Sequence, residues 1–91
     1  MKIVVVFPTS TEAKFFSHPS AATEQVIVEI GGVGLSAAAY STTKIIAQHQ
    51  PDWLIMAGIA GVYAHSSFAV GDVVLVSSEC ESDLGFFTPS G

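Results

Sequence analysis

The amino-acid sequence predicts an α/β fold, a mainly parallel or mixed sheet flanked by helices. Apolar runs without polar alternation, such as Ile3–Phe7, are typical of strands that are buried on both faces. Between such runs lies an alanine-rich stretch whose apolar residues have helical spacing. Glycine-rich turns, such as Gly31–Gly34, separate the predicted strands from the next elements of the chain. Together these observations favour strands and helices that alternate along the chain.

The predicted elements follow the order strand, helix, strand, helix, strand, strand. The first helix is predicted by Thr9 and Glu12, which have the T-x-x-E spacing of a capping box, and it carries the chain to Phe16. The second helix is expected to end before Pro51, because the residue before a proline avoids helical backbone. The predicted strands are Ile3–Phe7, Gln25–Ile30, Asp52–Gly58 and Asp72–Ser77, and the second helix runs from Leu35 to about His49.

The composition excludes several classes of partner. The 91 residues carry a net charge of −5 with three lysines and no arginine, so the basic surface that nucleic acids or anionic membranes require is absent. One cysteine, Cys80, excludes an internal disulfide, and His18, His49 and His65 lack the spacing of a metal site. The longest apolar stretch, from Trp53 to Tyr63, is too short to span a bilayer. We therefore expect a cytoplasmic protein without metal, membrane or nucleic-acid partner.

Three turns that follow predicted strands form the candidate ligand edge, at residues 8–12, 31–34 and 58–61. Ligands of such sheets bind beyond the carboxyl ends of the strands. Residues 32–37 also satisfy the G-x-G-x-x-A pattern of dinucleotide sites. The acidic residue at the expected distance, Asp52, precedes its strand and should lie at the opposite end of the sheet. A tight strand-to-helix turn is thus the simpler interpretation, and dinucleotide binding stays as the weaker alternative.

Glu12 has two interpretations. As a carboxylate in the first helical turn, it stabilises the start of the helix through the capping box and the helix dipole, and the pattern alone favours this role. As a carboxylate just beyond the first strand, it is placed to take a proton from an attacking water. Both roles are compatible with one side chain in different states.

Five motifs follow one another along the chain: Met1-Lys2-Ile3 with Glu12, Gly32-Val33-Gly34 with the following alanines, Pro51-Asp52, Ala57–Gly61 and Val70–Val74. Their order and spacing resemble the amino-terminal part of the nucleoside phosphorylase and nucleosidase superfamily. A narrower likeness rests on Gly58–Gly61, Glu81–Gly85 and Thr88-Pro89. In these segments the chain is most similar to the futalosine hydrolases of an alternative menaquinone pathway, and the methylthioadenosine/S-adenosylhomocysteine nucleosidases are the nearest rival.

The resemblance implies hydrolysis of the N-ribosidic bond of a purine-type nucleoside, without a cofactor, by a homodimer. It implies that Glu12 is the catalytic residue that handles water. It also implies that residues 1–91 are the amino-terminal portion of one domain, whose general acid and ribose-binding carboxylate lie in an absent carboxyl-terminal portion. The 91-residue chain alone is therefore expected to be inactive. By position, the substrate-binding residues are Thr9, Val33, Ile59, Ala60 and Gly61.

Two departures from the superfamily pattern narrow the expected reaction. Ile59 stands where methylthioadenosine nucleosidases usually have serine, which favours the futalosine interpretation. Met56 stands where bacterial purine phosphorylases place an arginine, and without arginine the chain favours water over phosphate as nucleophile. A methylthioadenosine/S-adenosylhomocysteine nucleosidase, a purine nucleoside phosphorylase, and an inactive fragment that folds or self-associates through an open sheet edge stay as alternatives.

Overall fold

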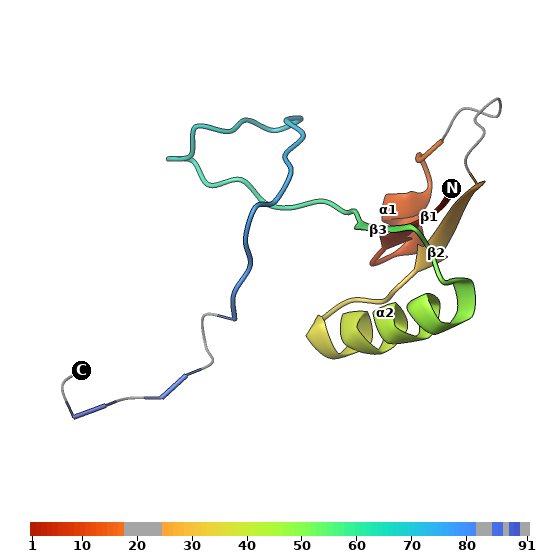
Figure 1. Ribbon diagram of the computed structural model, residues 1–91. Coiled ribbons are helices and arrows are strands. Elements are labelled where there is room, and N and C mark those ends of the chain that lie inside the picture. The colour runs from red at the N-terminus through yellow and green to blue at the C-terminus, as the bar shows by residue number, and fades with distance from the viewer. Residues whose placement is uncertain (18–24, 82–84, 87, 90–91) are drawn as a thin grey trace. The chain divides into compact units, whose positions relative to one another are not determined.

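The computed structural model describes residues 1–17, 25–81, 85–86 and 88–89 (Figure 1). The chain divides into two compact units, Met1–Gly61 and Val62–Gly91, and each is considered by itself. Every helix and strand of the described residues lies in the first unit. None of these helices is long and apolar enough to cross a membrane.

The first unit is a parallel three-stranded sheet of order β2-β1-β3. The strands are β1 (Lys2–Phe7), β2 (Gln25–Ile30) and β3 (Trp53–Met56). The short helix α1 (Ser10–Ala13) follows β1, and α2 (Leu35–His49) connects β2 to β3 (Figure 1). Because β2 and β3 are the two outer strands, α2 has to cross β1. The predicted α/β class is confirmed, and the described sheet is entirely parallel.

The core of this unit lies between β1 and α2. Val4 and Val6 are fully buried and pack with Ile45 of α2, which is 5% exposed. Ile27 of β2 and Leu54 of β3 stand beside Val4 in the register and complete the cluster. Side chains of one pleat face point the same way, so α2 covers the face that carries these residues.

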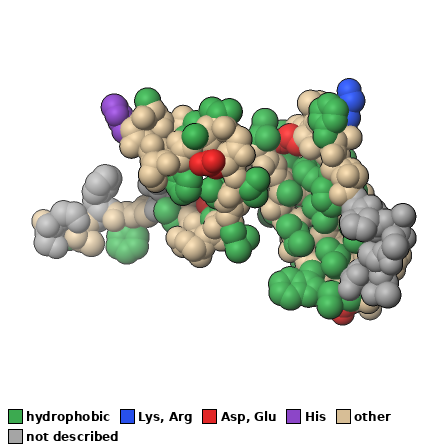
Figure 2. All heavy atoms as spheres, turned by 90° about the horizontal axis from the view of Figure 1, so that it is seen from above, with side chains coloured by type: hydrophobic (Ala, Val, Ile, Leu, Met, Phe, Trp, Pro, Cys, Tyr) green, Lys and Arg blue, Asp and Glu red, His purple; other side chains and the backbone are tan. Residues whose placement is uncertain are grey.

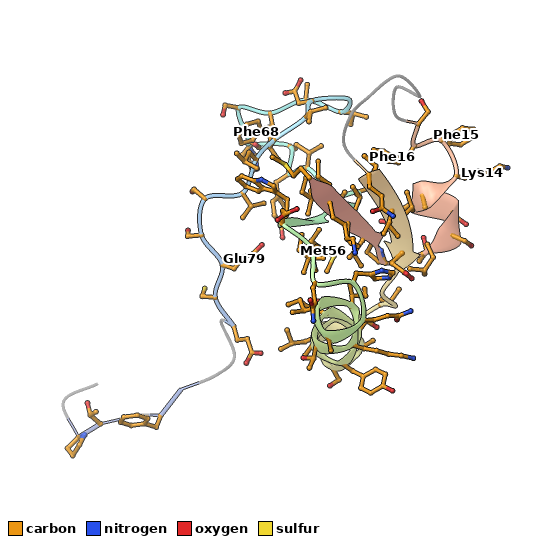
Figure 3. All side chains as sticks on the ribbon, turned by 45° about the vertical axis from the view of Figure 1, so that its right-hand side comes forward. Lys14, Phe15, Phe16, Met56, Phe68 and Glu79 are labelled. Atoms are coloured by element: carbon orange, nitrogen blue, oxygen red, sulfur yellow. The ribbon has the colours of Figure 1, made fainter. Side chains whose placement is uncertain are left out.

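The opposite face of the sheet is also apolar. Val5 of β1 is 5% exposed, whereas its register partners Val28 and Ile55 are 40% and 45% exposed. Phe16 packs on Phe7 of this face with 5.5 Å between ring centroids (Figure 3). Hydrophobic side chains are accordingly visible over the first unit, at the right of Figure 2. Val4–Phe7 of β1 are thus buried on both faces of the sheet, as their unalternating apolar run predicts. The same expectation is wrong for β3, in which Trp53, Ile55 and Met56 are exposed.

Hydrogen bonds at the amino edge of the sheet place Asp52 there. The Lys2 backbone N–H donates to Asp52 Oδ2 at 2.7 Å, and the Asp52 N–H donates to the Lys2 carbonyl at 2.8 Å. Lys2 Nζ donates to the carbonyl of His49, the last residue of α2, at 2.8 Å, and His49 Nε2 lies 2.8 Å from Glu29 Oε1. Asp52 is therefore at the end of the sheet opposite the 31–34 turn, where it cannot serve a dinucleotide ribose.

Three predicted elements differ from the structure by more than one residue. Asp72–Ser77 is not a strand, because a strand requires a neighbour for its backbone groups and the described residues pair none with this segment. The third strand is shorter than predicted and ends at Met56. The first helix ends at Ala13 and does not reach Phe16, whose ring turns back onto Phe7.

Two adjacent isoleucines test the position of the core. Ile45 is 5% exposed and Ile46 is 48% exposed, so Ile45→Ala removes a buried side chain whereas Ile46→Ala removes a half-exposed one. We expect Ile45→Ala to lower the free energy of unfolding by about 2–5 kcal/mol. Ile46→Ala should cost about 1 kcal/mol or less. Urea unfolding followed by circular dichroism measures both, and equal losses would contradict the described packing.

Candidate functional site

The site begins with the capping box at the end of β1. Thr9 is the N-cap of α1, with extended backbone at φ −135° and ψ 157°. Its Oγ1 accepts a hydrogen bond from the Glu12 backbone N–H at 3.2 Å and donates to Glu12 Oε2 at 2.8 Å. The predicted capping box is confirmed in its N-cap half, and here the Glu12 carboxylate returns to the Thr9 hydroxyl.

The second carboxylate oxygen of Glu12 reaches the loop that follows β3. The Ile59 backbone N–H donates to Glu12 Oε1 at 3.1 Å. This loop leaves the sheet after Met56, which Figure 3 labels, and the Ala57 N–H continues the pairing with β1 by donating to the Val6 carbonyl at 2.9 Å. A single carboxylate therefore links the loops that leave two neighbouring parallel strands.

The hydrogen bonds to Glu12 stabilise its ionised form. They lower the pKa of the Glu12 carboxyl below its ordinary value, chiefly through the Ile59 N–H, then through the Thr9 hydroxyl and least through the Thr9 backbone N–H, while partial burial opposes them. The group is a carboxylate at neutral pH, as an unshifted glutamate also is, and it stays ionised further into the acidic range. A carboxylate offers about four acceptor positions on its two oxygens, so the bonds from Thr9 and the Ile59 N–H still leave an acceptor for an incoming water.

The third turn lies at the same edge of the sheet, between β2 and α2. The Gly31 N–H donates to the Phe7 carbonyl at 2.8 Å, and the Ser41 hydroxyl of α2 donates to the Gly31 carbonyl at 2.7 Å. Gly32 and Gly34 have φ values of +87° and +95°, a backbone conformation that residues with a side chain rarely adopt. This turn presents Val33, which is 74% exposed, beyond the end of β2.

The predicted site residues thus fall into two groups. Thr9, Glu12 and Ile59 are joined by hydrogen bonds. Val33, Ala60 and Gly61 are exposed at or beyond the same sheet edge, and within the described residues no hydrogen bond ties them to Glu12. The sequence predicts Gly58 at the ligand edge, as the glycine that ends the third predicted strand, but assigns it no role of its own. The structure places it directly against the Glu12 carboxylate.

The described residues offer no set of three or more His, Cys, Asp or Glu side chains that is placed to hold a metal ion. The chemistry available at this edge is that of one ionised carboxylate, fixed by two hydrogen bonds, beside open backbone. Such a group can orient a water molecule and accept its proton.

Comparison with known proteins identifies the family of the chain. The sequence pattern of the Phosphorylase superfamily matches residues 4–89, and the chain belongs to this superfamily. It is 38% identical over 66 residues to a 5'-methylthioadenosine/S-adenosylhomocysteine nucleosidase of Hydrogenovibrio crunogenus, an alignment that covers 72% of this chain and 28% of the relative. It is 36% identical over 61 residues to the protein of the same name from Shewanella loihica, covering 67% of this chain and 26% of the relative.

The aligned segment therefore spans only about a quarter of the length of these curated relatives. A third relative, from Shewanella piezotolerans, carries the same name and is also 36% identical over 61 residues. No solved structure matches the chain significantly.

Two substitutions at Thr9 separate the effect of its hydroxyl on Glu12 from the effect of its side-chain size. Thr9→Val removes the hydrogen bond to Glu12 Oε2, so we expect the pKa of Glu12 to rise toward its ordinary value. Thr9→Ser keeps the hydroxyl and should keep the lowered pKa. Carbon-13 NMR of the Glu12 carboxyl carbon through a pH titration measures both. An unchanged titration in Thr9→Val would show that the hydroxyl does not hold the carboxylate.

The same hydrogen bonds make stability depend on pH. Because the pKa of Glu12 is lower in the folded chain, its contribution is complete above the ordinary glutamate pKa and is lost as pH falls through the lowered value. Glu12→Gln cannot titrate. The difference in free energy of unfolding between the unchanged chain and Glu12→Gln should therefore shrink across this acidic window. Urea unfolding at a series of pH values measures it, and a constant difference would refute the linkage.

Proposed function

We propose that this chain supplies the water-handling carboxylate of a purine nucleoside hydrolase. The observation that carries the proposal is the fixed, ionised Glu12 at the carboxyl edge of the sheet, with Thr9 on one oxygen and the Ile59 N–H on the other. Membership of the Phosphorylase superfamily supports a nucleoside as the substrate class. The open backbone beyond β3 is where the nucleoside would bind, beside Ile59, Ala60 and Gly61.

In the proposed reaction the bond between the ribose C1′ and the base nitrogen breaks, and the ribosyl group develops oxocarbenium character. A water oxygen forms the new bond to C1′, and its proton passes to the Glu12 carboxylate. The leaving base takes a proton from an acid that the resemblance places outside residues 1–91. Glu12 accelerates the reaction by orienting the water and by stabilising the positive charge. The products are ribose with its 5′ substituent and the free base.

Water is a better fit than phosphate as the nucleophile. A phosphorylase has to bind an anion and commonly does so with arginine, whereas this chain has none and carries a net charge of −5. The ionised Glu12 would also repel phosphate at close range. We therefore favour hydrolysis over phosphorolysis, and purine nucleoside phosphorylase is the weaker alternative for the reaction.

The comparisons change the order of candidate substrates. The futalosine interpretation depends in part on the isoleucine at position 59, yet Ile59 contributes its backbone N–H to the site and its side chain is 86% exposed. All three curated relatives are named for 5′-methylthioadenosine and S-adenosylhomocysteine. We propose these two nucleosides as the first substrates and futalosine as the second. A homodimer, a cytoplasmic location and a role in menaquinone synthesis stay predictions.

Replacing Glu12 tests the proposal in a catalytically complete protein, made by joining residues 1–91 to the remaining portion of a curated relative. Chromatography measures base release from 5′-methylthioadenosine, S-adenosylhomocysteine and futalosine in water. Inosine is tested separately in the presence of phosphate, for the phosphorylase alternative. We expect adenine from the first two, and Glu12→Gln should lower kcat by roughly 10²–10⁴-fold.

Glu79→Gln provides the matched control, because Glu79 is exposed in the second unit and no described contact involves it (Figure 3). Its kcat should equal that of the unchanged protein. Full turnover in Glu12→Gln would remove Glu12 from the mechanism. No base release from any nucleoside would favour a segment that folds or self-associates without catalysis.

A further inference from the structure

Gly58 lies between the Glu12 carboxylate and the Pro8 ring. A Cβ built on Gly58 would stand 3.2 Å from Glu12 Oε1 and 3.3 Å from Pro8 Cδ. Both contacts are closer than a methyl group normally makes, and they come from two different neighbours. A side chain at this position therefore has no room unless one of those neighbours moves.

The need for glycine at this position is one of space and not of backbone conformation. Gly32, Gly34, Gly71 and Gly85 have positive φ values, which glycine alone adopts readily. Gly58 does not belong to this group, so an alanine there would find an ordinary backbone. Gly58 is also exposed, which excludes dense core packing as its reason. What remains is the close approach of the carboxylate.

We propose that Gly58 is a positioning residue for Glu12, because only hydrogen at this position lets Oε1 reach the Ile59 N–H while Oε2 stays on the Thr9 hydroxyl. The proposal rests on the function proposed for Glu12. Gly58 directly precedes Ile59, whose N–H donates the hydrogen bond. The same two residues therefore bind the carboxylate and leave room for its close approach.

The geometry leaves little tolerance for a larger residue. The bond from the Ile59 N–H to Oε1 is already 3.1 Å long, near the upper end of good N–H···O geometry. Pro8 is a rigid ring, so the carboxylate is the more movable neighbour. A displacement of a few tenths of an ångström away from position 58 would lengthen this bond beyond the usual range and weaken it. Misplacement of a catalytic group lowers the rate of the chemical step.

Gly58→Ala in the 91-residue chain tests this without requiring catalysis. We expect the pKa of Glu12, read from its carboxyl carbon by NMR, to rise toward the ordinary value because the hydrogen bond that lowers it most is weakened. Gly61→Ala is the matched control, since Gly61 has no positive φ and a Cβ there meets nothing within 4 Å. The Glu12 titration should be unchanged in Gly61→Ala. An unchanged titration in Gly58→Ala overturns the proposal.

A second measurement covers the case in which Gly58→Ala does not fold. In the unchanged chain, an α proton of Gly58 should give a strong nuclear Overhauser effect to the δ protons of Pro8, and its absence overturns the proposed packing. The nucleosidase assay is independent of both results. A raised Glu12 pKa in Gly58→Ala together with no base release would uphold the positioning role and reject the proposed function.

Discussion

The central position of β1 in a parallel sheet is the constraint on which the site depends. Because β1 pairs in parallel with both β2 and β3, the loops after all three strands leave from one edge. Glu12 follows β1 and Ile59 follows β3, and they are 47 residues apart in the sequence. With either pairing antiparallel, the loop that follows that strand would leave from the other edge. The hydrogen bond between Glu12 and Ile59 therefore depends on the parallel topology. It fixes the carboxylate at the edge of the sheet where ligands of such folds bind.

The local part of this site was predictable, and the part that crosses the sheet was not. Thr9 and Glu12 are three residues apart, so their spacing alone predicts the capping box. The contact between Glu12 and Ile59 requires the strand order β2-β1-β3, which no short-range pattern contains. Gly58 illustrates the same limit. The sequence shows a glycine that ends a strand, but only the structure shows that a Cβ on this glycine would stand 3.2 Å from Glu12 Oε1.

The predictions for strands succeeded where pairing partners are present. Unalternating apolar runs predicted β1, and its Val4 and Val6 are fully buried. Asp72–Ser77 has a similar composition, yet within the described residues nothing pairs with it. Apolar β-branched sequence makes a segment suitable for a sheet, but the backbone hydrogen bonds come from a neighbour. Composition alone therefore does not determine where a strand forms.

The hydrogen bonds that fix Glu12 also limit its strength as a base. By lowering the pKa of its carboxyl they make it a weaker proton acceptor, and at the same time they hold the carboxylate in one orientation. This balance suits a reaction in which the departing base leaves a cationic ribosyl group, because water then needs to be held and oriented more than it needs to be deprotonated early. A negative charge beside that cation contributes further.

The most direct test of this account is the pH dependence of the Ile59 amide proton shift in the unchanged chain. If the Glu12 carboxylate accepts this hydrogen bond, the Ile59 resonance will move with the same apparent pKa as the Glu12 carboxyl carbon, below the ordinary glutamate value. An Ile59 amide that stays constant while Glu12 titrates would mean that no hydrogen bond joins them, and the proposed positioning of the carboxylate would be wrong.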